Sequence, residues 1–383
     1  MSRLADLLGR LERMGVRLLI EPPEGAPIRV GQAPERAKVV FTTRAAFRSL
    51  VRGDHLALAE AYLHCDVDVR GNLSEAMRVA EVLDLEASML AKLSFALRYR
   101  FGDRRRFQQH SIAFHYDRPV DFFLPWFERW RSYSHGFYQS PSDDSAQAQA
   151  RKFQYAIDAL ELAPGMRVLD IGAGWGGFLE YAGRQGISVH GITISEQQHR
   201  FVRELVRDHQ LPCAVEKVDL VDFRPERAFD AIVMMGSLEH LPDYEFVARF
   251  VSSSLAPGGG VYADFCSQRE SFQVGAFMRR YVWPGTARYV NVPRLLDAWL
   301  RAGLDIEELV DDTASYAHTV RDWANRLEGT REDLASKFGE QSVRAFLLYL
   351  WGSHHFLQHR RTQAYHLVAR FRPATEAIEG PRR

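Results

Sequence analysis

The sequence contains few cysteines and no long apolar run, and each shortage excludes a class of protein. Three cysteines occur among 383 residues, at Cys65, Cys213 and Cys266, and none forms a C-x-x-C pair. This argues against a disulfide framework and against a zinc site, and it fits a reducing cytoplasm. We therefore expect no metal. No stretch of about 18 apolar residues occurs, so no membrane-spanning helix is expected either.

Net charge is also lacking, because 49 Lys and Arg residues balance 49 Asp and Glu residues. A balanced chain has no general electrostatic reason to bind nucleic acid, and we expect no such partner. Basic charge gathers only at residues 98–107, where five arginines accompany two phenylalanines. Such a run either faces water as a linker or contacts anionic phospholipid head groups, where each basic residue contributes about 1 kcal/mol.

What is present is a regular alternation of apolar runs and helical patterns. Strand-like runs such as “MRVLDIG”, “ISVHGITIS” and “AFDAIVMMGS” are separated by amphipathic helical segments. This pattern predicts an α/β fold with a mostly parallel sheet and helices on both faces. We predict a small α+β domain at residues 1–97, the basic linker at 98–107, and a second, larger domain at 108–383.

A glycine-rich loop, “LDIGAGWGG”, lies between a predicted strand and helix at residues 169–177. Gly172 and Gly174 allow a sharp turn and a close approach of the backbone to a ligand. The loop satisfies G-x-G-x-x-G, so a dinucleotide site is an alternative. However, the next strand ends “GITIS”, without the acid that holds the ribose in NAD sites. With Asp170 before the first glycine, the loop instead looks like the S-adenosylmethionine loop of class I methyltransferases.

Several further segments point to one family. “LDIGAGWGG” resembles “LDIGCGWGG”, and “GITISEQQ”, “GSLEH”, “AFHYD”, “RRYVWPG” and “SYAHTVRDW” are similar to other segments of the same family. The chain therefore resembles the cyclopropane-fatty-acyl-phospholipid synthases, which include the mycolic acid cyclopropane synthases, from roughly residue 50 to 370. The resemblance implies a class I methyltransferase with a Rossmann-like sheet and helical insertions at 108–383. It also implies methyl transfer from S-adenosylmethionine to the cis double bond of a phospholipid acyl chain.

The resemblance also assigns residues to roles. The implied cofactor contacts are Tyr133, Ser134, Asp170, Gly172, Gly174, Gly176, Thr193 and Gln198. An alkene is a weak nucleophile, so the reaction needs exclusion of water, and aromatic side chains suit the pocket because cation–π contacts stabilise a carbocation. The aromatic residues predicted to line the substrate pocket are Tyr138, Phe265 and Trp283.

The sequence departs from the family where the proton is removed. In the family, a bound bicarbonate is held by a cysteine, a glutamate, a histidine and a tyrosine. Glu239 and Tyr316 match two of these positions, but His135 in “YSH” replaces the cysteine. Aligning “GGGVYADFCS” with the family's strand puts Phe265 at the position of the histidine. A slip of one residue would put Asp264 or Cys266 there instead.

Three outcomes of this departure stay open, and cyclopropane formation is the leading one. His135 either holds bicarbonate or acts as the base, since histidine titrates near neutrality. Alternatively, the cation loses a different proton and gives a methyl-branched or methylene-bearing chain. The third outcome is methylation of another lipid or small molecule. A catalytically inactive binder of lipid or cofactor is an alternative of another class.

The remaining expectations concern partners and location. We expect an unsaturated acyl lipid as substrate and peripheral contact with a phospholipid membrane surface. The predicted domain at 1–97 would mediate that contact or form a homodimer. The predicted location is the cytoplasm, at the inner face of the membrane.

Overall fold

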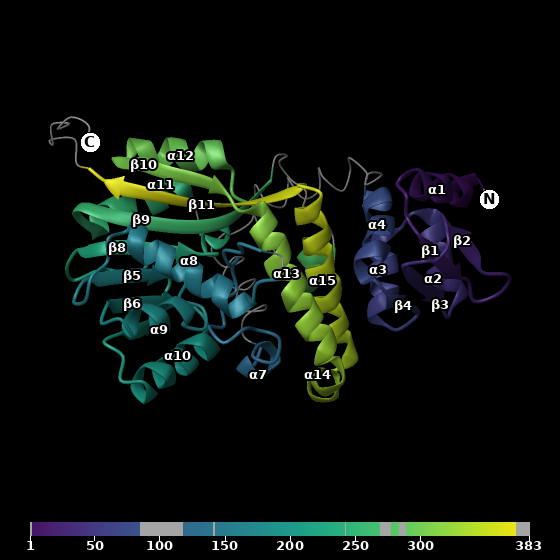
Figure 1. The fold of residues 1–383 in the computed structure, drawn as a ribbon, viewed down its shortest axis with the longest axis horizontal. Helices are drawn as coiled ribbons and strands as arrows, with labels where there is room; N and C mark the ends of the chain where they lie inside the picture. The colour runs from purple at the N-terminus through teal and green to yellow at the C-terminus, as the bar shows by residue number, and fades with distance from the viewer. Residues whose placement is uncertain are drawn as a thin grey trace. The chain divides into compact units, whose positions relative to one another are not determined.

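The computed structural model describes residues 2–84, 118–140, 142–241, 243–268, 277–282 and 289–372. Contacts within the chain group these residues into two compact units, which are coloured by residue number in Figure 1. Unit 1 contains the described residues of 2–84, 277–282 and 320–359. Unit 2 contains those of 118–268, 289–319 and 360–372. The predicted linker at 98–107 lies outside the described residues, so the predicted domain division stays a prediction.

The N-terminal part of unit 1 is a sheet that, in the described residues, has four strands in the order β2-β1-β3-β4. These are β1 (Leu18–Glu21), β2 (Ile28–Val30), β3 (Ala37–Phe41) and β4 (Val67–Gly71). Alternate residues of β3 are buried, as a strand with one face on a core requires. The helices that belong to this part are α1 (Ser2–Arg13), α2 (Arg44–Arg52), α3 (His55–Leu63) and α4 (Leu73–Asp84).

Unit 1 also takes in helices from the C-terminal third of the chain. These are the later part of α13 (Thr313–Gly329), then α14 (Arg331–Phe338), α15 (Glu340–Gln358) and the short π-helix η2 (Met278–Val282). Arg344 of α15 is buried and donates to the carbonyl oxygens of Tyr62 and Val67, at 3.0 and 3.1 Å. Its guanidinium also lies 3.1 Å from Asp68 and 2.8 Å from Glu340. This one side chain therefore ties α15 to α3 and β4.

Unit 2 is built on a sheet whose described strands follow the order β10-β11-β9-β8-β5-β6-β7. They are β5 (Arg167–Ile171), β6 (Ser188–Thr193), β7 (Ala214–Lys217), β8 (Phe229–Met235), β9 (Leu255–Gln268), β10 (Leu304–Asp311) and β11 (Thr362–Phe371). The five strands from β7 to β9 run parallel, and β11 pairs antiparallel with both β9 and β10. The predicted α/β class with a mostly parallel sheet is confirmed.

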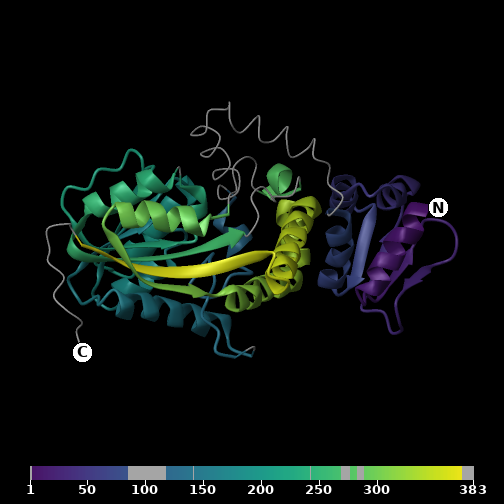
Figure 2. The ribbon, with the colours of Figure 1, turned by 90° about the horizontal axis from the view of Figure 1, so that it is seen from above.

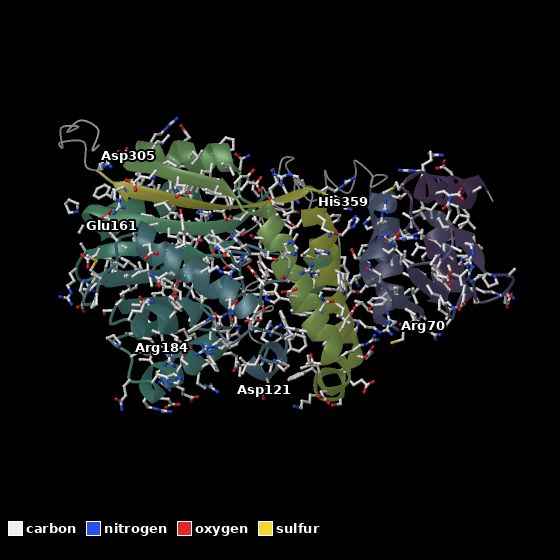
Figure 3. All side chains as sticks on the ribbon, viewed as in Figure 1. Arg70, Asp121, Glu161, Arg184, Asp305 and His359 are labelled. Atoms are coloured by element: carbon white, nitrogen blue, oxygen red, sulfur yellow. The ribbon has the colours of Figure 1, made fainter. Side chains whose placement is uncertain are left out.

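Helices cover both faces of this sheet, which Figure 2 shows edge on. One core includes residues of α11 (Tyr244–Ser254) and α12 (Val292–Arg301), and the other includes residues of α8 (Ser145–Ala159), α9 (Gly177–Gly183) and α10 (Glu196–Asp208). Two short helices, α7 (Val120–Phe123) and η1 (Leu238–His240), complete the described part of the unit. Charged side chains such as Glu161, Arg184 and Asp305 lie on its outer surface (Figure 3).

The strand order explains where a ligand can bind. β5 has β6 on one side and β8 on the other, so successive crossovers leave it in opposite directions. In open parallel sheets the ligand site lies at the carboxyl ends of the strands, at this change of direction. The loop after β5 is the glycine-rich segment that the sequence analysis singled out.

The buried contacts of Arg344 make a specific stability prediction. Arg344→Met is expected to lower the free energy of unfolding by about 3–5 kcal/mol, because it removes the buried cation from two carbonyls and from Asp68, while Glu340 keeps Arg331. The matched control is Arg331→Met, which removes a more exposed partner of the same Glu340 and should cost about 1 kcal/mol or less. Urea unfolding of both variants measures the difference. Equal losses would contradict the role given to Arg344.

Candidate active site

The loop between β5 and α9 is shaped by backbone conformations that favour glycine. Gly172, Gly174 and Gly176 have φ angles of +86°, +53° and +76°. A Cβ on Gly172 would lie 2.7 Å from Cβ of Ser237, which is too close for a side chain. A Cβ on Gly176 would press on Val202 instead, so this glycine serves the packing of α10.

A cavity of about 320 Å³ opens beside this loop. Five of the predicted cofactor residues line it, namely Tyr133, Gly172, Gly174, Thr193 and Gln198. Thr193 at the end of β6 donates to the side-chain oxygen of Gln198 at 2.7 Å, and Ser195 caps α10 by accepting from the Gln198 amide. These contacts hold Gln198 at the edge of the cavity.

The sequence analysis missed other residues that line the cavity. They are Asp219 and Leu220 after β7, and Ser237 and His240 after β8. An acid just beyond the third parallel strand was the available signal, because strand ends meet at one edge of such a sheet. Ser237 donates to the carbonyl oxygen of Ile171 at 2.6 Å and so joins the two strand ends.

The residues present fit S-adenosylmethionine. The cavity reaches the backbone of Gly172 and Gly174, and its lining combines apolar side chains with the acids Asp219 and Asp243. Asp170 is buried behind the loop, and burial raises its pKa to about 7. A buried carboxyl with a raised pKa gains from a nearby positive charge, such as a sulfonium.

A second group of polar residues surrounds the end of β9. The Cys266 amide donates to Oε1 of Glu239 at 2.6 Å, while Oε2 of Glu239 finds no hydrogen-bond partner among the described residues. Burial raises the pKa of Glu239 to about 7. The thiol of Cys266 is hydrogen-bonded to Tyr316, and burial raises the pKa of this thiol well above its usual range. Glu239, Cys266 and Tyr316 thus form one cluster, called the β9 cluster below.

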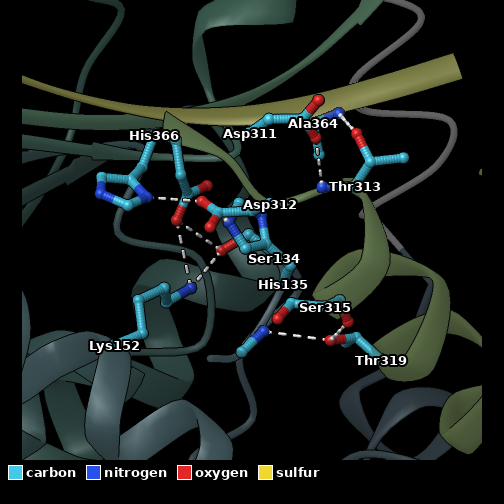
Figure 4. A network of polar contacts seen from close by, with 12 residues as sticks. Ser134, His135, Lys152, Asp311, Asp312, Thr313, Ser315, Thr319, Ala364 and His366 are labelled. Carbon is cyan, nitrogen blue, oxygen red and sulfur yellow. Dashed lines mark hydrogen bonds and ion pairs between the residues drawn. The ribbon is translucent and has the colours of Figure 1, made fainter. Parts of the chain in front are cut away.

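His135 is fully buried and lies beside this cluster. Its ring centroid is 5.1 Å from that of Tyr316, and its Nε2 lies 2.9 Å from Oδ2 of Asp312. The same carboxylate oxygen lies 2.5 Å from Nδ1 of His366 on β11 (Figure 4). Burial acts to raise the pKa of Asp312, but the bonds from the two histidines outweigh it and hold the pKa well below the usual range.

Ser134 is held by a buried ion pair and does not line the cavity. Lys152 of α8 donates to its hydroxyl at 2.6 Å, and the same Nζ lies 3.2 Å from Oδ2 of Asp264. Both charged side chains are fully buried, and burial lowers the pKa of Lys152. Nothing in the local sequence around Lys152 marks it as part of a site, because its partners lie 18 and 112 positions away.

The residues predicted to line the substrate pocket do not lie together in one described group. Phe265 is buried in the core between the sheet and its helices, whereas the thiol of its neighbour Cys266 is hydrogen-bonded to Tyr316. Successive side chains of a strand point to opposite faces, so only one of these two can join the cluster. Tyr138 packs on His318, with ring centroids 5.6 Å apart. Trp283 lies outside the described residues.

No group of three or more His, Cys, Asp or Glu side chains in the described ranges is arranged to hold a metal ion. Across the same ranges, no helix has the length and apolar character needed to cross a bilayer.

The sequence model of the mycolic acid cyclopropane synthetase family matches residues 103–367. The chain belongs to this family. The protein is therefore an S-adenosylmethionine-dependent methyltransferase, as the resemblance predicted. The match covers the whole described part of unit 2 up to Leu367 of β11.

Individual relatives agree with the family assignment. The chain is 26% identical over 363 residues to a probable fatty acid methyltransferase of Pseudomonas putida, covering 91% of this chain and 90% of the relative. It is 29% identical over 240 residues to the cyclopropane-fatty-acyl-phospholipid synthase of Escherichia coli, covering 62% of this chain and 61% of that enzyme. A cyclopropane synthase structure from Mycobacterium tuberculosis superposes with a TM-score of 0.65 at 20% identity, covering 68% of this chain and 98% of that one.

His135, which stands where the resemblance implies a cysteine, lies beside Tyr316. The β9 side chain that is hydrogen-bonded to Tyr316 is Cys266 and not Phe265. A histidine and a cysteine therefore both lie next to Tyr316. The roles predicted for His135, Glu239 and Tyr316 stay predictions.

The glycine loop gives a test of the cofactor cavity. Gly172→Ala is expected to weaken the binding of S-adenosylhomocysteine at least tenfold, since about 1.4 kcal/mol of strain or displacement is enough. Gly165→Ala is the control, because Gly165 has a similar φ of +88° but open space around its Cβ. Titration calorimetry should show wild-type affinity for that control. Equal affinity for both variants would exclude the loop from the binding site.

The raised pKa of Glu239 gives a second test, on stability. Its pKa moves from 4.5 to about 7 on folding, so the folded state is penalised increasingly from pH 4.5 to 7 and fully above pH 7. Glu239→Gln should therefore raise the free energy of unfolding by about 2 kcal/mol at pH 8 and by less at pH 5. Urea unfolding of the ligand-free protein measures this, with the exposed Glu226→Gln as control. A pH-independent difference would contradict the burial of the Glu239 carboxyl.

Proposed function

We propose that this enzyme methylates the cis double bond of unsaturated fatty acyl chains in phospholipids, and that ring closure to a cyclopropane is the main outcome. One observation carries the proposal. Two of the segments that line the cofactor cavity, 131–133 and 235–241, are also the segments that lead to His135 and carry Glu239. Proton-accepting groups therefore lie next to the place of the methyl donor.

The chemistry requires such an arrangement. When bound, S-adenosylmethionine supplies an electrophilic methyl group, whose addition to an alkene leaves a positive charge on the acyl chain. That charge is neutralised only when a proton leaves, so the site needs a base and must exclude water. The β9 cluster offers Oε2 of Glu239, which has no hydrogen-bond partner within the described ranges, and His135 beside it is fully buried.

The names of the relatives support the substrate class. The Escherichia coli relative is named for fatty acyl phospholipids, and the Pseudomonas putida relative for fatty acids. The presence of His135 where the resemblance implies a cysteine favours a second candidate, in which the cation loses a different proton and gives a methyl-branched or methylene-bearing chain. A changed base moves the point of proton removal, and therefore the product.

Contact with the membrane is part of the same proposal. We assign it to the domain predicted at 1–97 and the arginines at 98–107, which would place the enzyme at the inner face of the membrane. Dimerisation through the same domain is the alternative, and bicarbonate remains a candidate ligand of the β9 cluster.

The product of lipid methylation tests the proposal. Purified enzyme, S-adenosylmethionine and vesicles of unsaturated phosphatidylglycerol should give acyl chains heavier by one CH₂, with the double bond replaced by a ring. Mass spectrometry with ozonolysis distinguishes a ring from a retained double bond beside a new methyl group, which would support the second candidate. Free unsaturated fatty acid is the parallel substrate. Methylation of the free fatty acid alone would exclude the phospholipid as substrate.

Flotation of the enzyme with the same vesicles tests the proposed membrane contact. An enzyme that does not float with the vesicles would refute that contact.

A further inference from the structure

Asp312 lies between two buried histidines, and its position joins three segments far apart in the sequence. It follows β10 directly, while His135 belongs to the loop before α8 and His366 to β11. Figure 4 shows both imidazoles turned toward one carboxylate oxygen, Oδ2, which lies 2.9 Å from Nε2 of His135 and 2.5 Å from Nδ1 of His366. No substrate or cofactor role has been given to Asp312 or His366 above.

This geometry fixes the tautomer of each imidazole. An ionised carboxylate only accepts hydrogen bonds, so both nitrogens that face Asp312 must carry hydrogen. In its neutral form, His135 then has its proton on Nε2 and a free lone pair on Nδ1. His366 has its proton on Nδ1 and the lone pair on Nε2. Both lone-pair nitrogens are buried and have no hydrogen-bond partner among the described residues.

The two histidines differ in what surrounds them. His366 packs among aromatic rings, with centroids 5.0 Å from Phe137 and 4.9 Å from Tyr155. His135 also lies against Phe137, with centroids 5.9 Å apart, but its ring lies beside Tyr316 as well, whose hydroxyl bonds Cys266 in the β9 cluster. Of the two histidines, His135 is therefore the one in ring contact with a member of the β9 cluster.

We propose that Asp312 is a positioning residue that makes Nδ1 of His135 the proton acceptor of this enzyme, an inference that rests on the function proposed above. A C–H bond of the cationic acyl chain breaks, its electron pair forms the new carbon–carbon bond, and the proton joins the lone pair of Nδ1. The resulting imidazolium is paired with the Asp312 carboxylate, and the proton passes to water before the next turnover. A carboxylate that holds and compensates an imidazole is an established way to strengthen a histidine base.

The single charge of Asp312 sets a limit on the cluster. One carboxylate compensates one imidazolium, and a second buried positive charge would have no partner. His366 acts here as a second N–H donor, which keeps Asp312 oriented. The buried cation Lys152 is paired with Asp264.

Variants that preserve or remove single atoms test this assignment. Asp312→Asn removes the compensating charge, and His135→Gln keeps a donor at the Nε2 position but has no base at Nδ1. Both are expected to lower kcat about 100-fold or more while the KM for S-adenosylmethionine changes less than about threefold. His366→Asn keeps a donor at the Nδ1 position and should lower kcat by less than either of these variants. A merely structural role would instead raise KM and lower kcat together in all three.

The positions of the protons on the two imidazoles can be measured directly, so the proposal is also testable in protein that is not turning over substrate. Nitrogen-15 NMR of histidine-labelled, ligand-free protein should show a bare Nδ1 on His135 and a bare Nε2 on His366, assigned with the two histidine variants. The opposite tautomer of His135 would overturn the proposal, even if Asp312→Asn fails to fold.

Activity assays of the wild-type enzyme and of His135→Gln distinguish failure of this inference from failure of the proposed function. A wild-type enzyme that methylates no unsaturated lipid would refute the proposed function, while the NMR result would still decide the tautomers. A wild-type enzyme that is active, together with an equally active His135→Gln variant, would refute the role of His135 alone. Activity in carbon dioxide-free buffer should equal that with added bicarbonate, and dependence on bicarbonate would assign the proton to a bound anion instead.

Discussion

The ion pair between Lys152 and Asp264 is the contact on which the arrangement of the active site depends. Both side chains are fully buried, and their charged atoms lie 3.2 Å apart. Removing two charges from water is costly, and breaking such a pair costs about 3–5 kcal/mol because one charge is left uncompensated. The pair therefore strongly restricts how α8 can sit on β9, and both neighbouring segments are attached to it.

Each attachment positions one part of the chemistry. Lys152 holds the hydroxyl of Ser134, which fixes the loop that continues into His135. The backbone oxygen of Asp264 accepts from the amide of Gly236 at 3.0 Å, which fixes the segment that carries Glu239. The segments that carry His135 and Glu239 and the end of β9 are thus all held by one buried ion pair.

Burial acts on the acids of the site in two opposite ways. Asp170 and Glu239 are buried, and burial raises the pKa of each to about 7, although Lys152 acts in the opposite direction on Asp170. Asp312 is also buried, but two imidazole donors hold its pKa low. A carboxylate is stabilised where N–H groups replace the water it loses, so the donors on Asp312 outweigh its burial. The site therefore contains two buried carboxylates held by cationic or N–H partners, Asp264 and Asp312, and two acids with raised pKa values, Asp170 and Glu239.

The sequence by itself determined the fold class, the cofactor loop and the family. Apolar runs of strand length predict buried strands, and the glycines in “LDIGAGWGG” predict φ angles that other residues rarely adopt. Both predictions depend only on neighbouring residues in the sequence. The partners of Lys152, Asp264, Asp312 and His366 were decided only by tertiary structure, because these residues lie on different elements with no shared spacing. The choice between Phe265 and Cys266 was of the same kind. A shift of one residue reverses the face on which a strand's side chain lies, and only the packed sheet fixes that register.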